Sequence, residues 1–316
     1  MADSVKLDNW INSNINKSLT LVEFIWANEL NFNLFDIEAT LNIESEVYIG
    51  RGTDSNKHSA IHKSVSECIE RYLVNRLNLQ TSSGLALHTN AKLAKKNAQF
   101  EIYERDQFLC HFLSNTTFSK TNNCSPFVEK VKALTQAKKW KTDTYILNNK
   151  NNVFTVACAI KKNGLFLGLS TKDNLTEALN QSTIEALRNW IHIIYFKNNY
   201  TALKLKMENI KTPKEHGDFY LNNQNYLKIQ HLFEDKYISI KDEIYPLVEA
   251  HEIDLKSFSI LENIGLSCFL AESKFAQPLF FGLQNESNVN LSRLQHFTKN
   301  IEFSFKNIPN LPHPFR

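Results

Sequence analysis

Three stretches of the chain carry apolar residues at helical spacing. They lie at about residues 57–79, 91–113 and 174–197, where side chains three and four positions apart share one face of a helix. Each follows a short apolar run and a loop of small residues, which predicts a strand–loop–helix unit. The three preceding runs cover residues 47–53, 83–89 and 165–171.

The rest of the chain alternates between predicted strands and shorter helices. Residues 19–43 alternate with period two, which indicates two strands joined near 31–33. Asn163-Gly164 between apolar runs is typical of a hairpin turn. We expect the other strands at 144–147, 153–160, 257–261, 266–272 and 278–281, and the other helices at about 4–18, 127–140 and 291–303.

The organisation of the chain indicates one domain. Segment 205–245 is polar, and its residues indicate no particular chemistry. A loop that contacts a substrate is left open as an interpretation of this segment. Because no linker rich in Ser, Gly or Pro divides the sequence, we interpret residues 1–316 as a single interleaved α/β (α+β mixed) domain.

The three long helices repeat one pattern of charged residues. In the first two helices the matched residues are 34 positions apart, and the third copy is partial. The copies read Ala60-x6-Glu67-x2-Glu70-Arg71, Ala94-x6-Glu101-x2-Glu104-Arg105 and Ala178-x6-Glu185-x2-Arg188, with Gln181 one turn before Glu185. A single ExxER stretch is usually a solvated helix face, whereas three copies indicate one shared site.

Five carboxylates brought together need cations. Two unit charges about 4 Å apart interact by roughly 4 kcal/mol at an effective dielectric constant near 20, and Arg71 and Arg105 cannot neutralise five glutamates. Oxygen ligands without Cys or His suit Mg²⁺, which is commonly shared with substrate phosphates. The pattern predicts a magnesium–nucleotide site in which the two arginines contact phosphate or orient the ligand.

These residues resemble the YcaO family of ATP-dependent enzymes that modify peptide backbone amides. The resemblance covers most of the chain, and it depends on the order and spacing of its blocks. The chain departs from the family at Asn97, where Ser is frequent, and at Arg188, where Gln is usual. The matching blocks are Gly50-x-Gly52, Ala60 to Tyr72, Ser83-Gly84-Leu85-Ala86, Glu101-x2-Glu104-Arg105-Asp106, Gln181-x3-Glu185 and residues 309–315.

The resemblance implies a mixed α/β fold, with mixed sheets and glutamate-bearing helices around a Mg–ATP site without a P-loop. The implied metal ligands are Glu67, Glu70, Glu101, Glu104 and Glu185. The implied residues for binding the nucleotide are these five together with Arg71, Ser83, Asn97, Arg105, Gln181 and Arg188. Arg105 and the terminal carboxylate of Arg316 are the implied catalytic groups.

The implied activity is cyclodehydration of Cys, Ser or Thr in a ribosomally made precursor peptide. The side chain attacks the preceding amide, ATP phosphorylates the amide oxygen, and loss of phosphate gives a thiazoline or oxazoline ring, as in thiazole/oxazole-modified bacteriocins. Thioamidation and amidine formation are alternatives within the family. A non-catalytic subunit that docks peptide or scaffolds a complex is the alternative from another class.

The same resemblance gives expectations about partners. Only about 40 residues precede the first glutamate unit, which leaves no room for a winged-helix peptide-binding domain. We therefore expect a separate leader-binding protein, of E1-like or winged-helix type, and negligible processing by the chain alone. A flavin dehydrogenase partner and a homodimer are left open.

The last residues, 309–316, form a proline-bearing tail. Pro309, Pro312 and Pro314 lower the entropy cost of holding an extended segment, and Leu311 and Phe315 offer apolar anchors. In the YcaO family a proline-rich end reaches the active site. We therefore expect an ordered tail there rather than a frayed end.

Composition adds limits to this picture. A formal charge of +3 favours neither nucleic-acid nor membrane partners, and no apolar run reaches the length of a membrane span. Five cysteines without a CxxC pair indicate reduced thiols and a cytoplasmic protein. His58 and His62 have the spacing of a metal pair, but the sequence offers no third ligand beside them, so we interpret them as a helix-surface pair.

Overall fold

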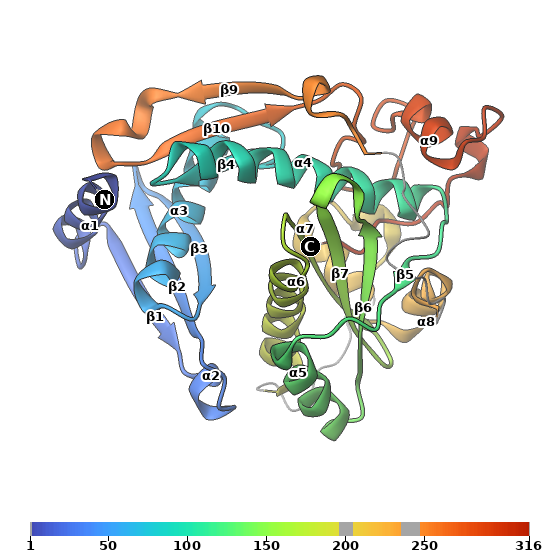
Figure 1. The fold of residues 1–316 in the computed structure, drawn as a ribbon, viewed down its shortest axis with the longest axis horizontal. Coiled ribbons are helices and arrows are strands. Elements are labelled where there is room, and N and C mark those ends of the chain that lie inside the picture. The colour runs from blue at the N-terminus through green and yellow to red at the C-terminus, as the bar shows by residue number, and fades with distance from the viewer. Residues whose placement is uncertain (1, 196–204, 235–246, 316) are drawn as a thin grey trace. The chain divides into compact units, whose positions relative to one another are not determined.

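The computed structural model describes residues 2–195, 205–234 and 247–315 (Figure 1). The chain packs into two compact units, each made of two segments. Unit 1 comprises residues 1–102 and 253–273, and unit 2 comprises residues 103–252 and 274–316. The division into units does not test whether they fold together as one domain, so the single domain over residues 1–316 stays a prediction.

The first sheet of unit 1 supports the first glutamate helix. Strands β1 (Leu19–Phe24), β2 (Phe35–Ile43) and β3 (Glu46–Asp54) are antiparallel in that order. Helix α3 (Lys57–Arg76) lies along one face of this sheet. Asn56 caps the helix by accepting a hydrogen bond from the Ser59 amide, which satisfies one of the amides left free at a helix start.

A second antiparallel sheet of unit 1 joins distant parts of the chain. Strand β4 (Leu85–His88) pairs with β10 (Ser267–Glu272), which pairs with β9 (Asp254–Phe258). Helix α1 (Ala2–Asn14) buries Leu7 and Ile11 in the same core as residues of α3, β4 and β10. Segments far apart in the sequence thus share the core of unit 1.

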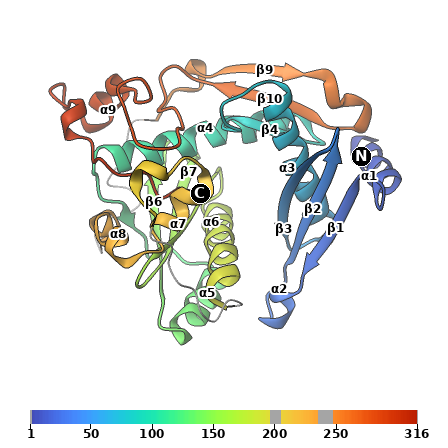
Figure 2. The ribbon, with the colours of Figure 1, turned by 180° about the vertical axis from the view of Figure 1, so that it is seen from behind.

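Unit 2 is built on one antiparallel sheet with helices on it (Figure 2). Its strands are β5 (Ser119–Lys120), β6 (Lys141–Asn148), β7 (Phe154–Lys161) and β8 (Leu165–Lys172). Helix α6 (Leu175–Trp190) packs on β7 and β8, and α5 (Pro126–Ala137) packs beside it. β6, β7 and β8 are buried along nearly their whole length, because their two faces are covered.

Helix α4 (Ala91–Leu113) contributes residues to both units. The smaller helices are α2 (Trp26–Glu29), α7 (Pro213–Phe219), α8 (Asn223–Leu227) and α9 (Leu291–Thr298). Short 3-10 turns lie at Lys150–Asn152, Met207–Asn209, Gln230–Phe233, Ala250–Glu252, Ser259–Ile264 and Phe305–Asn307, and a π turn lies at Ile191–Tyr195. In the described part of the chain, every helix is too short or too polar to cross a membrane.

The mixed α/β fold class is confirmed, and all pairings between the described strands are antiparallel. Several predicted elements differ from the structure. The strand expected at 257–261 is β9 at Asp254–Phe258, followed by a 3-10 turn, and the helix expected at 291–303 ends at Thr298. Helix α2 separates the two strands of residues 19–43, and residues 278–281 lack strand pairing. The third long helix ends at Trp190 before its π turn, and the predicted positions 196–197 lie outside the described residues.

Candidate functional site

The β3–α3 element of unit 1 holds Glu67 against the strand. A side chain at Gly50 could not fit, because its Cβ would lie 2.2 Å from the backbone oxygen of Ser64 and 2.5 Å from the Cys68 nitrogen. The helix therefore approaches β3 closely at this glycine. The Glu67 carboxylate accepts a hydrogen bond of 2.8 Å from the Arg51 amide, the residue after the glycine.

The β8–α6 element of unit 2 repeats this arrangement. The Cβ of a side chain at Gly168 would lie 2.1 Å from the Ser182 oxygen and 2.6 Å from the Ala186 nitrogen. The Glu185 carboxylate accepts a hydrogen bond of 2.8 Å from the Leu169 amide. Matched residues of the two elements are 118 positions apart (168 − 50 = 185 − 67). The first and third copies of the sequence pattern are therefore one structural repeat.

The second copy of the pattern has a different structure. Gly84 has a positive φ of 79°, and its missing Cβ faces the Ala271 oxygen of β10, with only the Ile102 side chain of α4 nearby and no helix backbone. The Leu85 amide, which would match Arg51 and Leu169, donates to the Ser82 oxygen. Glu101 still stands as far into its helix as Glu67 and Glu185 do (67 − 57 = 101 − 91 = 185 − 175). What differs is the strand before the helix, because β4 pairs with β10.

Glu70 and Glu104 also bind strand amides. Glu70 accepts a hydrogen bond of 3.0 Å from the Leu87 amide in β4. Glu104 accepts one of 2.9 Å from the Thr171 amide in β8, and its other oxygen lies 2.7 Å from the Arg105 guanidinium. Four of the five predicted metal ligands are thus oriented by one backbone N–H each, which fixes where the second carboxylate oxygen points.

The charges in each unit repel. In unit 1, burial followed by the nearby Glu101 and Glu67 raises the pKa of Glu70 well above its usual value. In unit 2, burial followed by Glu104 raises the pKa of Glu185 to about 7, against the opposing effects of the Leu169 amide, Arg188 and Arg105. The ionised carboxylates are therefore costly to hold together without further positive charge.

A hard divalent cation fits these donors. Within the described residues, Glu70 and Glu185 each use one carboxylate oxygen for a hydrogen bond and keep the other oxygen for a ligand. Carboxylate oxygens are the ligands Mg²⁺ prefers, and a cation would offset the repulsion that raises both pKa values. Glu67, Glu70 and Glu101 belong to unit 1, and Glu104 and Glu185 belong to unit 2.

The other predicted nucleotide-binding residues lie near these glutamates in the sequence. Arg71 pairs with Glu67 at 2.7 Å and is largely exposed, so its guanidinium can reach another ligand. Arg188 is close enough to Glu185 to lower its pKa. Ser83 and Asn97 in unit 1 and Gln181 in unit 2 are partly buried. Their nucleotide contacts stay predictions.

Residues 312–315 of the proline-bearing tail are buried in unit 2. His313 is fully buried, its backbone oxygen accepts from His216 Nδ1 at 2.8 Å, and Tyr220 donates to the Pro312 oxygen. The Arg105 guanidinium lies 3.8 Å from the centre of the Phe315 ring, a cation–π contact. The tail therefore reaches the arginine that pairs with Glu104. Arg316 lies outside the described residues.

One buried ion pair beside the glutamates was not identified from the sequence. Asp106, the residue after Arg105, pairs with Arg293 of α9 in unit 2, and both side chains are nearly inaccessible to solvent. Asp106 also accepts from the Gln277 amide at 2.9 Å. Since these partners are more than 170 positions away, only the acidic residue inside an apolar helix could have hinted at the pair.

A large cavity of unit 2 lies elsewhere. It has a volume of about 820 Å³, and its walls include Lys139, Lys161, Trp140, Tyr226 and Phe233. None of the predicted magnesium or nucleotide ligands lines this cavity. Lys139 and Lys141 of this wall are exposed to solvent.

Comparisons with known proteins identify the fold. No family model and no curated protein matches the sequence. The structure is similar to YcaO from Methanopyrus kandleri bound with AMPPCP and Mg²⁺, with a TM-score of 0.62 and 12% identity over 91% of this chain and 96% of that one.

Two further solved structures share the fold. A heterocyclase in complex with substrate and cofactor matches with a TM-score of 0.68 and 12% identity, over 99% of this chain and 57% of that one. The E. coli microcin synthetase McbBCD complex with pro-MccB17 bound matches with a TM-score of 0.50 and 11% identity, over 89% of this chain and 73% of that one. The chain therefore has the YcaO fold, as its motifs predicted.

Proposed function

We propose that this protein is a YcaO-type enzyme that uses Mg–ATP to modify backbone amides of a ribosomally made precursor peptide. The observation that carries the proposal is the set of oriented glutamates on α3, α4 and α6, which repel one another within each unit. Glu67, Glu70, Glu101, Glu104 and Glu185 would hold Mg²⁺. The similarity to a YcaO structure bound with AMPPCP and Mg²⁺ supports this choice of ligand.

The proposed reaction is cyclodehydration of Cys, Ser or Thr to thiazoline or oxazoline. Bound Mg–ATP would supply a phosphoryl group, which turns the amide oxygen from a poor leaving group into a good one. The protein's part is to position and neutralise charge. Arg71 and Arg105, Ser83, Asn97, Gln181 and Arg188 would serve the nucleotide. The similarity of this structure to a heterocyclase favours this reaction over thioamidation and amidine formation.

The tail has a separate proposed role. Phe315 holds the end of the tail against Arg105, and Arg105 pairs with Glu104. We propose that the tail positions Arg105 for phosphate and that the terminal carboxylate of Arg316 accepts a proton from the substrate. The all-buried course of residues 312–315 supports a positioning function over a frayed end.

The proposed partners follow from the same class of protein. A leader-binding protein would deliver the precursor peptide. The similarity to a heterocyclase with substrate supports a bound substrate, and the similarity to a synthetase complex supports a partner protein. The five free cysteines fit a reducing cytoplasm. We expect the chain without its partner to process peptide negligibly.

A non-catalytic, peptide-docking subunit is the second candidate. The observation that favours it is Arg188, which stands at the position of the β8–α6 element that Glu70 occupies in the β3–α3 element (188 − 70 = 118). An arginine there supplies positive charge beside Glu185 and reduces the need for a cation. The enzyme is favoured because Glu70 and Glu104 keep their strand contacts.

Calorimetry with a non-hydrolysable ATP analogue tests the proposal. We expect Mg²⁺-dependent binding to the wild-type chain and a loss of at least about tenfold in affinity, or 1.4 kcal/mol, for Glu70→Gln and Glu104→Gln. Glu177→Gln is the control, because Glu177 is an exposed glutamate of α6 outside the pattern. Absence of nucleotide binding with and without Mg²⁺ would favour the docking subunit.

Mass spectrometry of precursor peptide, co-expressed with this protein and its leader-binding partner, tests the reaction. Cyclodehydration removes one water for each ring, whereas thioamidation replaces oxygen by sulfur. The nucleotide products should be ADP and phosphate. Formation of AMP would contradict the proposed phosphorylation of the amide oxygen.

A further inference from the structure

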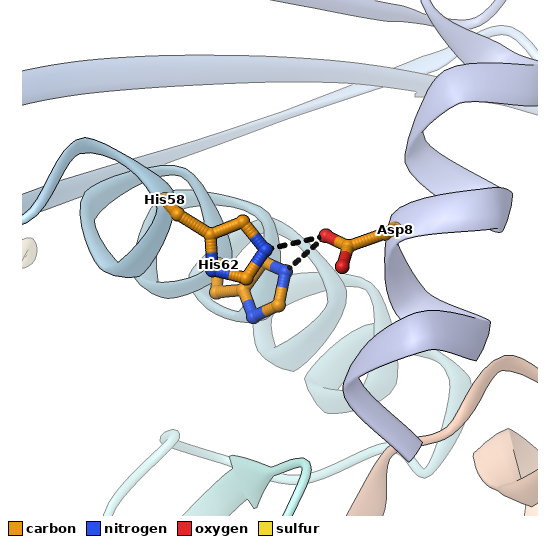
Figure 3. Close-up of side chains that lie close together, drawn as sticks. All are labelled: Asp8, His58 and His62. Atoms are coloured by element: carbon orange, nitrogen blue, oxygen red, sulfur yellow. Dashed lines mark hydrogen bonds and ion pairs between the residues drawn. The ribbon is translucent and has the colours of Figure 1, made fainter. Parts of the chain in front are cut away.

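Three side chains of unit 1 gather at one point between α1 and α3 (Figure 3). His58 and His62 lie one turn apart on α3, and Asp8 reaches them from α1. The Nε2 atoms of His58 and His62 lie 2.7 and 2.8 Å from the same Asp8 oxygen. Figure 3 shows both imidazole rings turned toward that carboxylate.

The structure supplies the third ligand that the sequence did not reveal. His58 and His62 have the i, i+4 spacing that places two imidazoles on one side of a helix. Asp8 is 50 positions before His58, so only tertiary packing brings it beside the pair. Two imidazoles and one carboxylate form a common donor set for zinc and for other divalent transition metals.

The three ligand atoms, one from each side chain, are close enough to bind such an ion once they move slightly apart. Zinc lies about 2.0–2.1 Å from nitrogen and oxygen ligands, so neighbouring ligand atoms of a tetrahedral site are about 3.3 Å apart. Here the hydrogen-bonded contacts are 2.7 and 2.8 Å, and the three ligand atoms all lie within 4.8 Å of one another. Moving each side chain by about half an ångström makes room for the metal.

The site is open on one side. The side chain of His58 is 56% exposed and that of Asp8 is 36% exposed, whereas His62 is 15% exposed. Solvent or a small ligand can therefore reach a fourth coordination position. The partly buried His62 gives the site a fixed wall, and the exposed His58 can adjust to the ion.

We propose that Asp8, His58 and His62 bind a divalent transition metal, with zinc as the expected ion, and that the metal joins α1 to α3. Each histidine binds through Nε2 in its neutral form, so one Nε2 proton per ring moves to Nδ1 or to solvent. This site is independent of the proposed magnesium site, because imidazole nitrogen is a ligand for zinc rather than for Mg²⁺.

A metal here would stabilise the N-terminal helix. Helix α1 is held to the core of unit 1 by the buried Leu7 and Ile11, and the three ligands add a link between α1 and α3. An ion that binds only the folded form raises the melting temperature with its concentration. Zinc should therefore raise the melting temperature of the protein before any nucleotide or peptide is added.

The experiment titrates zinc into the full-length protein, which is first freed of transition metals and kept in excess Mg²⁺. Calorimetry measures zinc binding, and thermal melting measures its effect on stability. We expect one equivalent of zinc to bind the wild type and to raise its melting temperature. Asp8→Asn, His58→Asn and His62→Asn should each weaken binding at least about tenfold. The exposed Asp3→Asn on α1 and His251→Asn in unit 2 are matched controls and should bind zinc as the wild type does.

His58→Asn is the decisive variant, because an exposed side chain can be replaced without harm to the fold. The absorption spectrum of a Co²⁺ substitute gives a second measurement, since thiolate ligands produce charge-transfer bands that imidazole and carboxylate ligands lack. Absence of zinc binding by the wild type would overturn the proposal. Equal binding by His58→Asn and the wild type, or a thiolate spectrum, would also overturn it.

Discussion

The β3–α3 and β8–α6 elements share one backbone arrangement but differ in the charges around their glutamates. In both, a glycine lets a helix approach a strand, and the next residue donates its amide to a helix glutamate at 2.8 Å. Glu67 shares its carboxylate with the exposed Arg71 and is itself 34% exposed. Glu185 is only partly exposed, and burial followed by the nearby Glu104 raises its pKa to about 7. The backbone scaffold thus sets the position of a carboxylate, whereas its neighbours set its charge.

One position separates the two elements chemically. Three residues after the shared glutamate stands Glu70 in the first element and Arg188 in the second. Glu70 lies near two other carboxylates, and Arg188 offsets the negative charge on Glu185. We interpret the first element as the more dependent on a cation and the second as carrying part of its own neutralising charge.

The largest expected effect is on turnover. Glu70→Gln should lower Mg–ATP turnover by at least about a thousandfold, or roughly 4 kcal/mol, because a neutral isostere removes a metal ligand. Glu104→Gln should do the same. The matched change Arg188→Gln should cost less than about tenfold, or 1.4 kcal/mol, because Gln is the usual residue of the resembled family there. ATPase assays with the leader-binding partner and peptide measure all three.

The same variants make a prediction about stability. Without metal, Glu70→Gln relieves repulsion from Glu101 and Glu67, so it should melt no lower than the wild type. Full turnover in both glutamate variants would remove these carboxylates from the proposed site. A lower melting temperature for Glu70→Gln would mean that its hydrogen bond to Leu87 outweighs the repulsion.

The next effect tests whether the two scaffolds are equivalent. Gly50→Ala and Gly168→Ala should each destabilise the protein by about 3 kcal/mol, because the added Cβ overlaps helix backbone in both. Chemical denaturation measures the free energy of unfolding. Ser170→Ala is the control, since Ser170 already carries a Cβ beside α6.

A difference between the glycine variants would break the comparison. Gly52 matches Ser170 across the two elements (52 + 118 = 170), yet a Cβ at Gly52 would lie 2.1 Å from the Ala60 oxygen. Gly52→Ser should therefore destabilise as Gly50→Ala does. Tolerance of Gly52→Ser would show that α3 can shift to the spacing of α6.

A smaller effect is the pH dependence from Glu185. Its pKa is raised from 4.5 to about 7 in the folded state, so the folded protein binds more protons than the unfolded chain between these values. The stability contribution of Glu185 therefore falls as pH rises from 4.5 to about 7 and stays low above that. We expect a loss of about 2 kcal/mol, because partial exposure reduces the full value of the shift.

Denaturation curves from pH 4 to 8, without metal, compare the wild type with Glu185→Gln. The wild type should lose stability relative to the variant across this range, and Mg²⁺ should restore it by lowering the pKa of Glu185. Glu177→Gln is the control on the same helix. Parallel curves for the wild type and Glu185→Gln would mean that Arg188 and Arg105 already neutralise the site.

The smallest expected effect concerns the tail, which contacts Arg105 in unit 2. Phe315→Ala should lower peptide modification by at least about tenfold, or 1.4 kcal/mol, while binding of the ATP analogue changes much less. Removal of Arg316 alone leaves the buried residues 312–315 in place and separates the role of the terminal carboxylate from packing. Wild-type modification by both variants would contradict a catalytic role for the tail.

The sequence by itself determined the helices and the charged pattern on them. Helical periodicity gave α4 its observed limits, and the residue spacing identified Glu67 and Glu185 as equivalent. Such signals are local, because a helix repeats every 3.6 residues and its faces follow from the order of residues alone. The resemblance based on these motifs led to the YcaO fold that the comparison of structures confirmed.

Only the tertiary structure decided which partners each side chain meets. It showed that Gly84 lies against the backbone of β10, that Asp106 is neutralised by Arg293, and that Asp8 completes the His58–His62 pair. These contacts join residues 50 to 187 positions apart, and no local pattern encodes them. They arise because strands and helices must bury their apolar faces together, and that packing fixes which polar groups are left to meet.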